Sequence, residues 1–330
     1  MIEIEQALGW INWENPSEIS DSNQYWIGRI GDRNISEVER KDTIDDLAKA
    51  VRRLPNPLEQ AEILIFCGTR GYLLGMLDEA VGWLQKAADI YEYCADHHRY
   101  ATALWILFIV KRGEGKYKQA FDLARRSRRL FDEIANDRLI KKRVEEESWY
   151  RGRILDMTCD LISSPEDMYE CLFEFHGSNL SPSAAEIKNR IATQVEKKDY
   201  QKTGDEMQLL LGITLRSLIP QETAESLAFC GVVSWVLEDK SGAIQFFRSA
   251  MTQYIPASFE YAVIQWMLGL ALFAFPADHY SGITNMEASI RDFDKLRLKA
   301  THENKLDQKD WFAIHYSAMK RILRTQVEGT

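Results

Sequence analysis

Two stretches of this chain repeat the same residue pattern, and this internal repetition constrains the fold more than any other feature of the sequence. Ala61–Ala87 reads AEILIFCGTRGYLLGMLDEAVGWLQKA, and Ala224–Ala250 reads AESLAFCGVVSWVLEDKSGAIQFFRSA. They align without a gap and share the opening Ala-Glu, the tripeptide Phe-Cys-Gly and two later alanines. A third copy begins at Ala101, and a further run opens at Ala262. The spacing of these starting alanines predicts a repeat of about 40 residues.

Each copy is predicted to be a pair of helices. Glycine and proline are scarce, at 18 and 8 of 330 residues, which argues against sandwiches, barrels and propellers because those folds need many short turns. Two weaker copies are expected to begin near Arg143 and Ser183. We interpret them as helix pairs over residues 148–162 with 168–175 and 183–197 with 205–218, and Pro220 is expected to end the last helix.

The repeat resembles the tetratricopeptide repeat (TPR) family. The resemblance rests on a large apolar residue and Leu/Cys-Gly in the first helix, Gly-x-(Leu/Tyr)-x-x-Ala between the helices, and a large apolar residue followed by Ala in the second. In the first copy these residues are Leu64, Cys67, Gly68, Gly75, Leu77, Ala80, Leu84 and Ala87. In the second copy they are Leu104, Leu107, Gly115, Tyr117, Ala120 and Ser127. The small residues are expected where the paired helices cross closely.

Three features depart from the family pattern. The period is longer than the one usual in the family, which is about 34 residues. The proline that typically ends a repeat is missing from the first two copies, and Phe108 stands where glycine is expected. The longer period resembles the variants of about 40 residues in kinesin light chains, peptide-sensing bacterial regulators and the sensor regions of large signalling ATPases.

The resemblance implies an all-α fold, a right-handed α-solenoid of antiparallel helix pairs that stack into a TPR-like superhelix. Amphipathic helices over 36–54 and 309–324 suit the caps that stacked repeats require. We therefore expect an irregular, Trp-rich N-terminal arm at 1–35, with turn residues at Asn15 and Pro16. An N-terminal capping helix at 36–57, TPR-like helical repeats at 58–307, and a C-terminal capping helix and tail at 308–330 complete the chain.

The resemblance also implies a binding groove, because the first helix of each TPR pair lines the concave face. Counting along these helices gives a predicted partner-binding groove of Ile65, Thr69, Tyr72, Trp105, Ile109, Arg112, Val232, Trp235, Trp266 and Phe273. Aromatic residues and arginine are the usual anchors of protein interfaces. The alternative is that these aromatics pack against a neighbouring helix or against the N-terminal arm.

A basic stretch from Lys111 to Arg143 carries twelve Lys and Arg against five Asp and Glu, in a chain of net charge −9. Its candidate patch consists of Arg125, Arg126, Arg128, Arg129, Lys141, Lys142 and Arg143. We interpret it as a solvated helix face, or alternatively as a docking surface for an acidic protein, and the acidic arm at 1–35 could be that partner in cis. The overall charge argues against a general nucleic-acid binder.

Residues that would carry chemistry are few. Gly113-Glu114-Gly115-Lys116 is too short for a phosphate-binding loop and follows no strand. Cys94, Asp96, His97 and His98 lie close together in the sequence but lack a second pair of metal ligands. We expect no cofactor, no metal and no catalytic residues.

The cellular location follows from the absence of export signals. The five cysteines are widely spaced and form no C-x-x-C, which is typical of free thiols in a reducing compartment. The most apolar stretch, 261–277, is shorter than a membrane span. We therefore expect a cytoplasmic protein.

These observations predict a non-enzymatic scaffold, adaptor or regulatory subunit that binds another protein or a peptide segment in its concave groove. The alternatives are a sensor or regulatory domain of a signalling system, controlled by a ligand or peptide, and an enzyme or RNA-binding accessory protein. The sequence leaves open the partner, the oligomeric state and whether residues 1–35 dock on the groove in cis.

Overall fold

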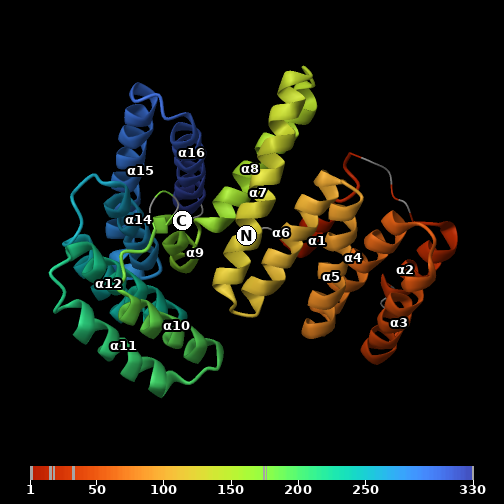
Figure 1. Cartoon of the computed structure of the whole chain (residues 1–330), viewed down its shortest axis with the longest axis horizontal. Coiled ribbons are helices and arrows are strands. Elements are labelled where there is room, and N and C mark those ends of the chain that lie inside the picture. Colours follow the sequence, from red (N-terminus) through yellow and green to blue (C-terminus); the bar gives the residue numbers. More distant parts are fainter. Residues whose placement is uncertain are drawn as a thin grey trace. The chain divides into compact units, whose positions relative to one another are not determined.

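The computed structural model describes residues 3–14, 17, 19–31, 34–173, 175 and 177–328, and these ranges are all-helical, without a β-strand. The chain divides into two compact units, an N-terminal unit of residues 2–157 and a C-terminal unit of residues 158–330. Within each unit, many of the helices that follow one another along the chain pack side by side (Figure 1). The predicted all-α class is therefore confirmed. The predicted turn at Asn15 and Pro16 lies outside the described residues.

The N-terminal unit begins with a short helix and continues through longer ones. Its elements are α1 (Ile4–Leu8), α2 (Asp21–Gly31), α3 (Glu37–Ala50), the 3-10 helix η1 (Val51–Arg53), α4 (Pro57–Leu73), α5 (Leu77–Tyr93), α6 (His97–Gly113), α7 (Tyr117–Ile140) and α8 (Val144–Leu161), which continues past the unit boundary. The N-terminal arm, which we expected to be irregular, thus contains α1 and α2. Helix α1 has only five residues, and packing against α4 and α6 stabilises it.

The C-terminal unit has a corresponding series of α-helices, with its 3-10 helices at other places. Its elements are α9 (Pro165–Glu170), η2 (Cys171–Phe173), α10 (Pro182–Glu196), α11 (Tyr200–Thr214), α12 (Pro220–Val236), α13 (Lys240–Met251), α14 (Phe259–Phe273), η3 (Pro276–Asp278), α15 (His279–His302) and α16 (Leu306–Glu328). The alignment of Ala61 with Ala224 brings both ends of α4 onto both ends of α12, and α7 and α15 are also equal in length. The short α9 packs against α12 and α14, as α1 packs against α4 and α6.

This correspondence extends to individual buried side chains. The fully buried Trp105 and Trp266 occupy matching places in α6 and α14. The hydroxyl of Ser127 donates to the carbonyl of Ala101, and the hydroxyl of Ser289 donates to the carbonyl of Ala262, both at 2.7 Å. The two gap-free sequence copies therefore mark a larger helical unit that occurs twice, and the shorter repeat lies inside each unit.

Tight turns of one kind join many of the successive helices. At the evenly spaced Gly75, Ala95 and Gly115 the backbone has φ of 79°, 55° and 76°. At Ala95 the amide donates to Glu92 O and the next amide, of Asp96, donates to Tyr91 O, which ends α5 in a Schellman motif. The carboxylate of Asp96 then accepts from the amide of Arg99 and starts α6. A helix with its turn thus accounts for half of the predicted repeat, and a helix pair accounts for all of it.

The close helix crossing predicted at Gly68 is present. A methyl group at Gly68 would lie 2.5 Å from Leu84 Cγ and 3.1 Å from the carbonyl oxygen of Ala80. At the equivalent Gly231 a methyl group would lie 2.5 Å from a ring carbon of Phe247. Glycine at these places lets a large side chain of the following helix pack directly on the backbone.

Two expectations for the middle of the chain were wrong. Residues 168–175 do not form a regular paired helix, because α9 ends at Glu170 and the short η2 follows it. Pro220 does not end a helix but begins one, since it is the first residue of α12. At the first position of a helix the backbone N–H has no partner within the helix, so a proline there loses no hydrogen bond. The preceding helix, α11, had already ended at Thr214. The helices predicted over 36–54 and 309–324 are confirmed by α3 with η1 and by α16.

Candidate functional site

Helices α4 and α6 contact an N-terminal segment of the same chain, of which residues 3–14, 17 and 19–20 are described. In this segment Glu5 pairs with Arg70 at 2.5 Å. The carbonyl of Trp10 lies 2.7 Å from His98 Nε2, and the carbonyl of Ile11 accepts from Arg99 Nε at 3.3 Å. The segment thus contacts α4 and α6 through Arg70, His98 and Arg99, none of which belongs to the predicted groove.

Two glutamates on α4 bind the end of this segment. Glu62 accepts hydrogen bonds from Asn12 Nδ2 at 2.7 Å and from the Ser17 hydroxyl at 2.5 Å. Glu59, one turn earlier, accepts from the amide and the hydroxyl of Ser20, at 2.9 and 2.6 Å. Both glutamates are buried. The hydrogen bonds from Ser20 and Asn23 favour the charged carboxylate and hold the pKa of Glu59 below its ordinary value.

The C-terminal unit repeats this arrangement on α12. Glu225 accepts from the Ser178 hydroxyl at 2.5 Å and from the amide of Asn179 at 2.7 Å. Glu222 accepts from the amide of Ser181 at 2.8 Å, and hydrogen bonds from Ser181 and Ser217 lower the pKa of Glu222. The two glutamates occupy the same places in α12 as the first pair does in α4. Each unit therefore holds a serine-containing segment with a Glu-x-Ala-Glu pair.

Each unit also contains a cluster of rings, to which the segment of the N-terminal unit contributes Trp10 and Trp13. In the N-terminal unit it comprises Trp10, Trp13, His98, Phe131, Trp149 and Tyr150, with Trp13 stacked on Trp149 at 4.0 Å between ring centroids. In the C-terminal unit it comprises Phe175, Phe259, Phe293, Trp311, Phe312 and His315. Burial lowers the pKa of His98, and Tyr150 Oη lies 3.0 Å from its Nδ1. His98 is therefore a packed core residue.

The predicted groove residues fall into two groups. Five are buried and have no surface to offer a partner: Ile65, Thr69, Trp105, Val232 and Trp266. The indole of Trp266 donates to the carbonyl of Ile162 at 2.8 Å, so this side chain has a structural role. The other five are partly exposed: Tyr72, Ile109, Arg112, Trp235 and Phe273. Trp105 and Trp266 thus agree with the alternative interpretation, in which some aromatics of the predicted groove pack inside the protein.

Four of the partly exposed residues occupy equivalent places in the two units. Tyr72 and Trp235 lie near the ends of α4 and α12, and Arg112 and Phe273 lie near the ends of α6 and α14. In the N-terminal unit the Tyr72 hydroxyl packs close to Gly113, beside Arg112. In the C-terminal unit the Lys240 ammonium lies over the ring of Trp235, and its Nζ is 5.8 Å from the ring centroid. All four side chains are partly exposed.

The predicted basic patch is spread along α7 and the turn after it. Arg129 pairs with Glu133 at 3.1 Å, Lys141 with Asp137 at 2.8 Å, and Arg143 with Glu146 at 3.3 Å. Arg126 donates to the hydroxyl of Tyr100. Arg125 and Arg128 also have interactions, and Lys142 forms the left-handed turn residue at φ 57°. This local pairing favours the solvated helix face over a docking surface.

The residues whose pattern was incomplete for a metal or phosphate site have structural roles. Asp96 caps α6 and His98 is buried in the ring cluster, so neither points with Cys94 toward a common centre. Gly115 is a left-handed turn residue between α6 and α7. In the part of the chain that the structure describes, no group of three or more His, Cys, Asp or Glu side chains is placed to hold a metal ion. None of the five cysteines is in a disulfide.

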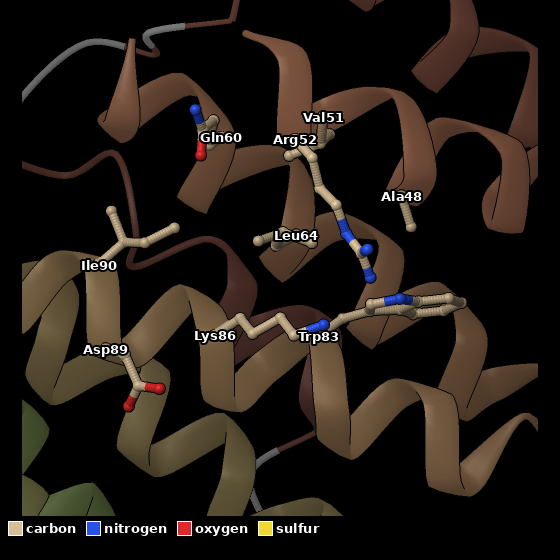
Figure 2. A pocket seen from close by; sticks show the side chains of 9 residues that line it. All are labelled: Ala48, Val51, Arg52, Gln60, Leu64, Trp83, Lys86, Asp89 and Ile90. Atoms are coloured by element: carbon tan, nitrogen blue, oxygen red, sulfur yellow. The ribbon is translucent and has the colours of Figure 1, made fainter. Parts of the chain in front are cut away.

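A pocket of about 270 Å³ opens between α3 with η1, α4 and α5. Its walls are apolar, from Ala48, Val51, Leu64, Ile90 and the buried indole of Trp83, and its polar residues are Arg52, Gln60, Lys86 and Asp89. Figure 2 shows the side chains of Arg52 and Lys86 extending toward Trp83, whereas the carboxylate of Asp89 points away. Sequence reasoning missed this pocket, because its residues come from four elements and form no motif.

Comparison with known proteins identifies no relative: no protein-family model and no curated protein matches this chain. Among the described helices, none is both long enough and apolar enough to cross a membrane.

The paired glutamates were also missed by sequence reasoning, although a signal for them exists. The tetrapeptide EQAE at 59–62 returns as ETAE at 222–225, and SEIS at 17–20 returns as SNLS at 178–181. These two polar motifs recur together and lie outside the positions where helices cross. Their joint recurrence indicates that the glutamate motif and the serine motif contact each other. Only the structure shows that each serine motif binds the glutamate pair of its own unit.

Proposed function

We propose that this chain is a non-enzymatic scaffold or adaptor that binds an extended protein or peptide segment on the inner helices of a TPR-like array. The observation that carries the proposal is the segment of the chain itself, held by buried glutamates on α4 and again on α12. Contacts to backbone amides, such as that of Ser20 with Glu59, are ones that many peptide sequences could make.

The TPR-like assignment, with a right-handed solenoid of antiparallel helix pairs, is part of the same proposal. It is supported by the crossings at Gly68 and Gly231, by the even spacing of the turns from Gly75 to Gly115, and by the packing of successive helices. A cytoplasmic location is supported by the free thiols, of which Cys67 and Cys230 are buried at equivalent places.

The proposed point of contact with a partner is formed by the C-terminal ends of α4, α6, α12 and α14, which we call the inner helices. In the C-terminal unit they carry Trp235 and Phe273, aromatics of the kind that anchor interfaces. In the N-terminal unit the equivalent Tyr72 and Arg112 offer a more polar contact, so the two units would select different side chains of a partner. The paired glutamates already bind the chain's own segment. The partner is therefore expected to bind only at the ends of these helices.

Affinity purification from the source cells tests the proposal. We expect the wild-type chain and the control variant Leu298→Ala to recover the same partner, since Leu298 is exposed near the far end of α15 from His279, whose ring lies against Phe273. Trp235→Ala and Phe273→Ala should each reduce recovery several-fold with an unchanged helical circular dichroism spectrum. Equal recovery by all the variants would refute the groove.

A second candidate function, a sensor controlled by a small ligand, is favoured by one observation. The pocket between η1 and α5 brings two cationic side chains over an apolar floor, on a part of α4 that the chain's own segment does not use. Ligand binding there would change the stability of the first helices of the N-terminal unit without any contact to the groove.

A further inference from the structure

The pocket lined by Arg52, Lys86 and Trp83 has an unbalanced charge. Neither Arg52 nor Lys86 has an ion-pair or hydrogen-bond partner among the residues that the structure describes. The neighbouring carboxylate, that of Asp89, accepts from Gln85 Nε2 at 2.9 Å and points away from the two cations (Figure 2). An anion that entered the pocket would thus meet two cationic donors, and the carboxylate of Asp89 that also lines the pocket is engaged by Gln85.

The rest of the pocket is apolar. Leu64 and Trp83 are buried, and Ala48, Val51 and Ile90 complete the wall. Since inorganic anions gain nothing from such a surface, the pocket suits a molecule that joins an anionic group to a hydrocarbon group. A volume of about 270 Å³ holds one apolar side chain with its carboxylate, or a short organic acid.

The C-terminal unit shows that this charge is not needed for the fold. At the places that match Arg52 and Lys86 it has Leu215 and Ser249, and at the place that matches Trp83 it has Phe246. The surrounding elements, α11 to α13, keep the order and packing of α3 to α5. Two copies of one unit have therefore diverged at the pocket while retaining the frame around it.

The pocket is also separate from the face that holds the chain's own segment. Gln60 and Leu64 line the pocket, and Glu62, between them in the sequence, binds the segment. Residues two apart on a helix point in directions about 200° apart, so Gln60 and Leu64 face away from Glu62 on α4. A ligand in the pocket does not compete with the segment.

We propose that this pocket binds a carboxylate carried on an apolar group, with Arg52 and Lys86 as its cationic donors and Trp83 as the floor for the hydrocarbon part. The C-terminal residue of a peptide and a free medium-chain organic acid have this chemistry in common. This inference does not depend on the proposed groove, because it concerns another face of the N-terminal unit.

Isothermal titration calorimetry on the full-length chain tests the site. The probes are N-acetyl-isoleucyl-leucine with a free carboxylate, its C-terminal amide, hexanoate and hexanamide. We expect at least one acid to bind, and to bind about tenfold or more tightly than its amide, since two charge-assisted hydrogen bonds are lost in the amide. Binding of the dipeptide acid alone identifies a peptide terminus, and binding of hexanoate alone identifies a free acid.

Two double variants decide whether the pocket is responsible. Arg52→Leu with Lys86→Ser installs the residues of the C-terminal unit and should weaken acid binding about tenfold or more. The control Arg291→Leu with Lys299→Ser removes the same charges from exposed places on α15 and should leave binding unchanged. The proposal is overturned if no acid binds at millimolar concentration, if acids and amides bind alike, or if the first double variant retains wild-type affinity. A melting curve for each variant establishes that it is folded.

Discussion

A methyl group added at Gly231 would lie 2.5 Å from a ring carbon of Phe247, and one at Gly269 would lie 2.6 Å from Met286 Cγ. The following helix therefore places its large side chain against bare backbone. In the second copy the large and small residues are exchanged. The position aligned with Gly269 holds the buried Phe108, and the position aligned with Met286 holds the buried Ala124. This exchange explains how Phe108 can stand where the repeat pattern predicts glycine.

Gly231→Ala should destabilise the C-terminal unit by about 1–3 kcal/mol, because the new methyl group overpacks the crossing with α13. The control is Gly204→Ala, at an exposed place in α11 where a methyl group would meet nothing within 4 Å. It should stabilise the unit by up to about 1 kcal/mol through helix propensity. Chemical denaturation followed by circular dichroism measures both changes, and equal effects of the two substitutions would contradict the close crossing.

The recurring element is a helix that ends in a left-handed residue and is followed at once by the cap of the next helix. After α12 the amide of Glu238 donates to Trp235 O and the amide of Asp239 donates to Ser234 O. Asp239 then caps α13. These turns could be predicted at Gly75 and Gly115, where glycine marks them. They could not be predicted at Ala95, Lys142, Lys198 or Glu238, since those residue types do not favour positive φ.

Glu238→Gly should raise the stability of the C-terminal unit by about 0.5–1 kcal/mol relative to Glu238→Ala, because glycine adopts φ of +63° without a steric penalty. Glu238 is exposed enough that neither substitution removes a packed side chain. Thermal unfolding of the two variants makes the comparison. A glycine variant less stable than the alanine variant would contradict the left-handed turn.

The contact between α4 and the N-terminal segment should depend on pH. Because hydrogen bonds from Ser20 and Asn23 lower the pKa of folded Glu59 below 4.5, its stabilisation is present above that pH and is lost as the pH falls through the lowered pKa. Glu59→Gln should therefore lower the melting temperature at pH 7 and have a smaller effect near the acid end of the stable range. The exposed Glu287→Gln serves as the control, and a Glu59→Gln effect that does not change with pH would count against the contact.

At the scale of the whole molecule, the sequence was sufficient for the helix class and for most of the helix positions from residue 36 onward. It was insufficient for α1 and α9, because helices of five and six residues are stabilised by tertiary packing and have no periodicity of their own. The groove stays a prediction. Counting along the helices selected residues such as Trp105, but it could not show that this side chain is fully buried.

The central claim is that the inner helices bind an extended segment of a partner near Trp235 and Phe273. Hydrogen–deuterium exchange of the full-length chain, with and without the partner recovered by affinity purification, tests it most directly. If the partner binds there, it should slow amide exchange at the ends of α12 and α14 and leave exchange in α7 unchanged. Slowed exchange confined to α7, with α12 and α14 unaffected, would contradict it.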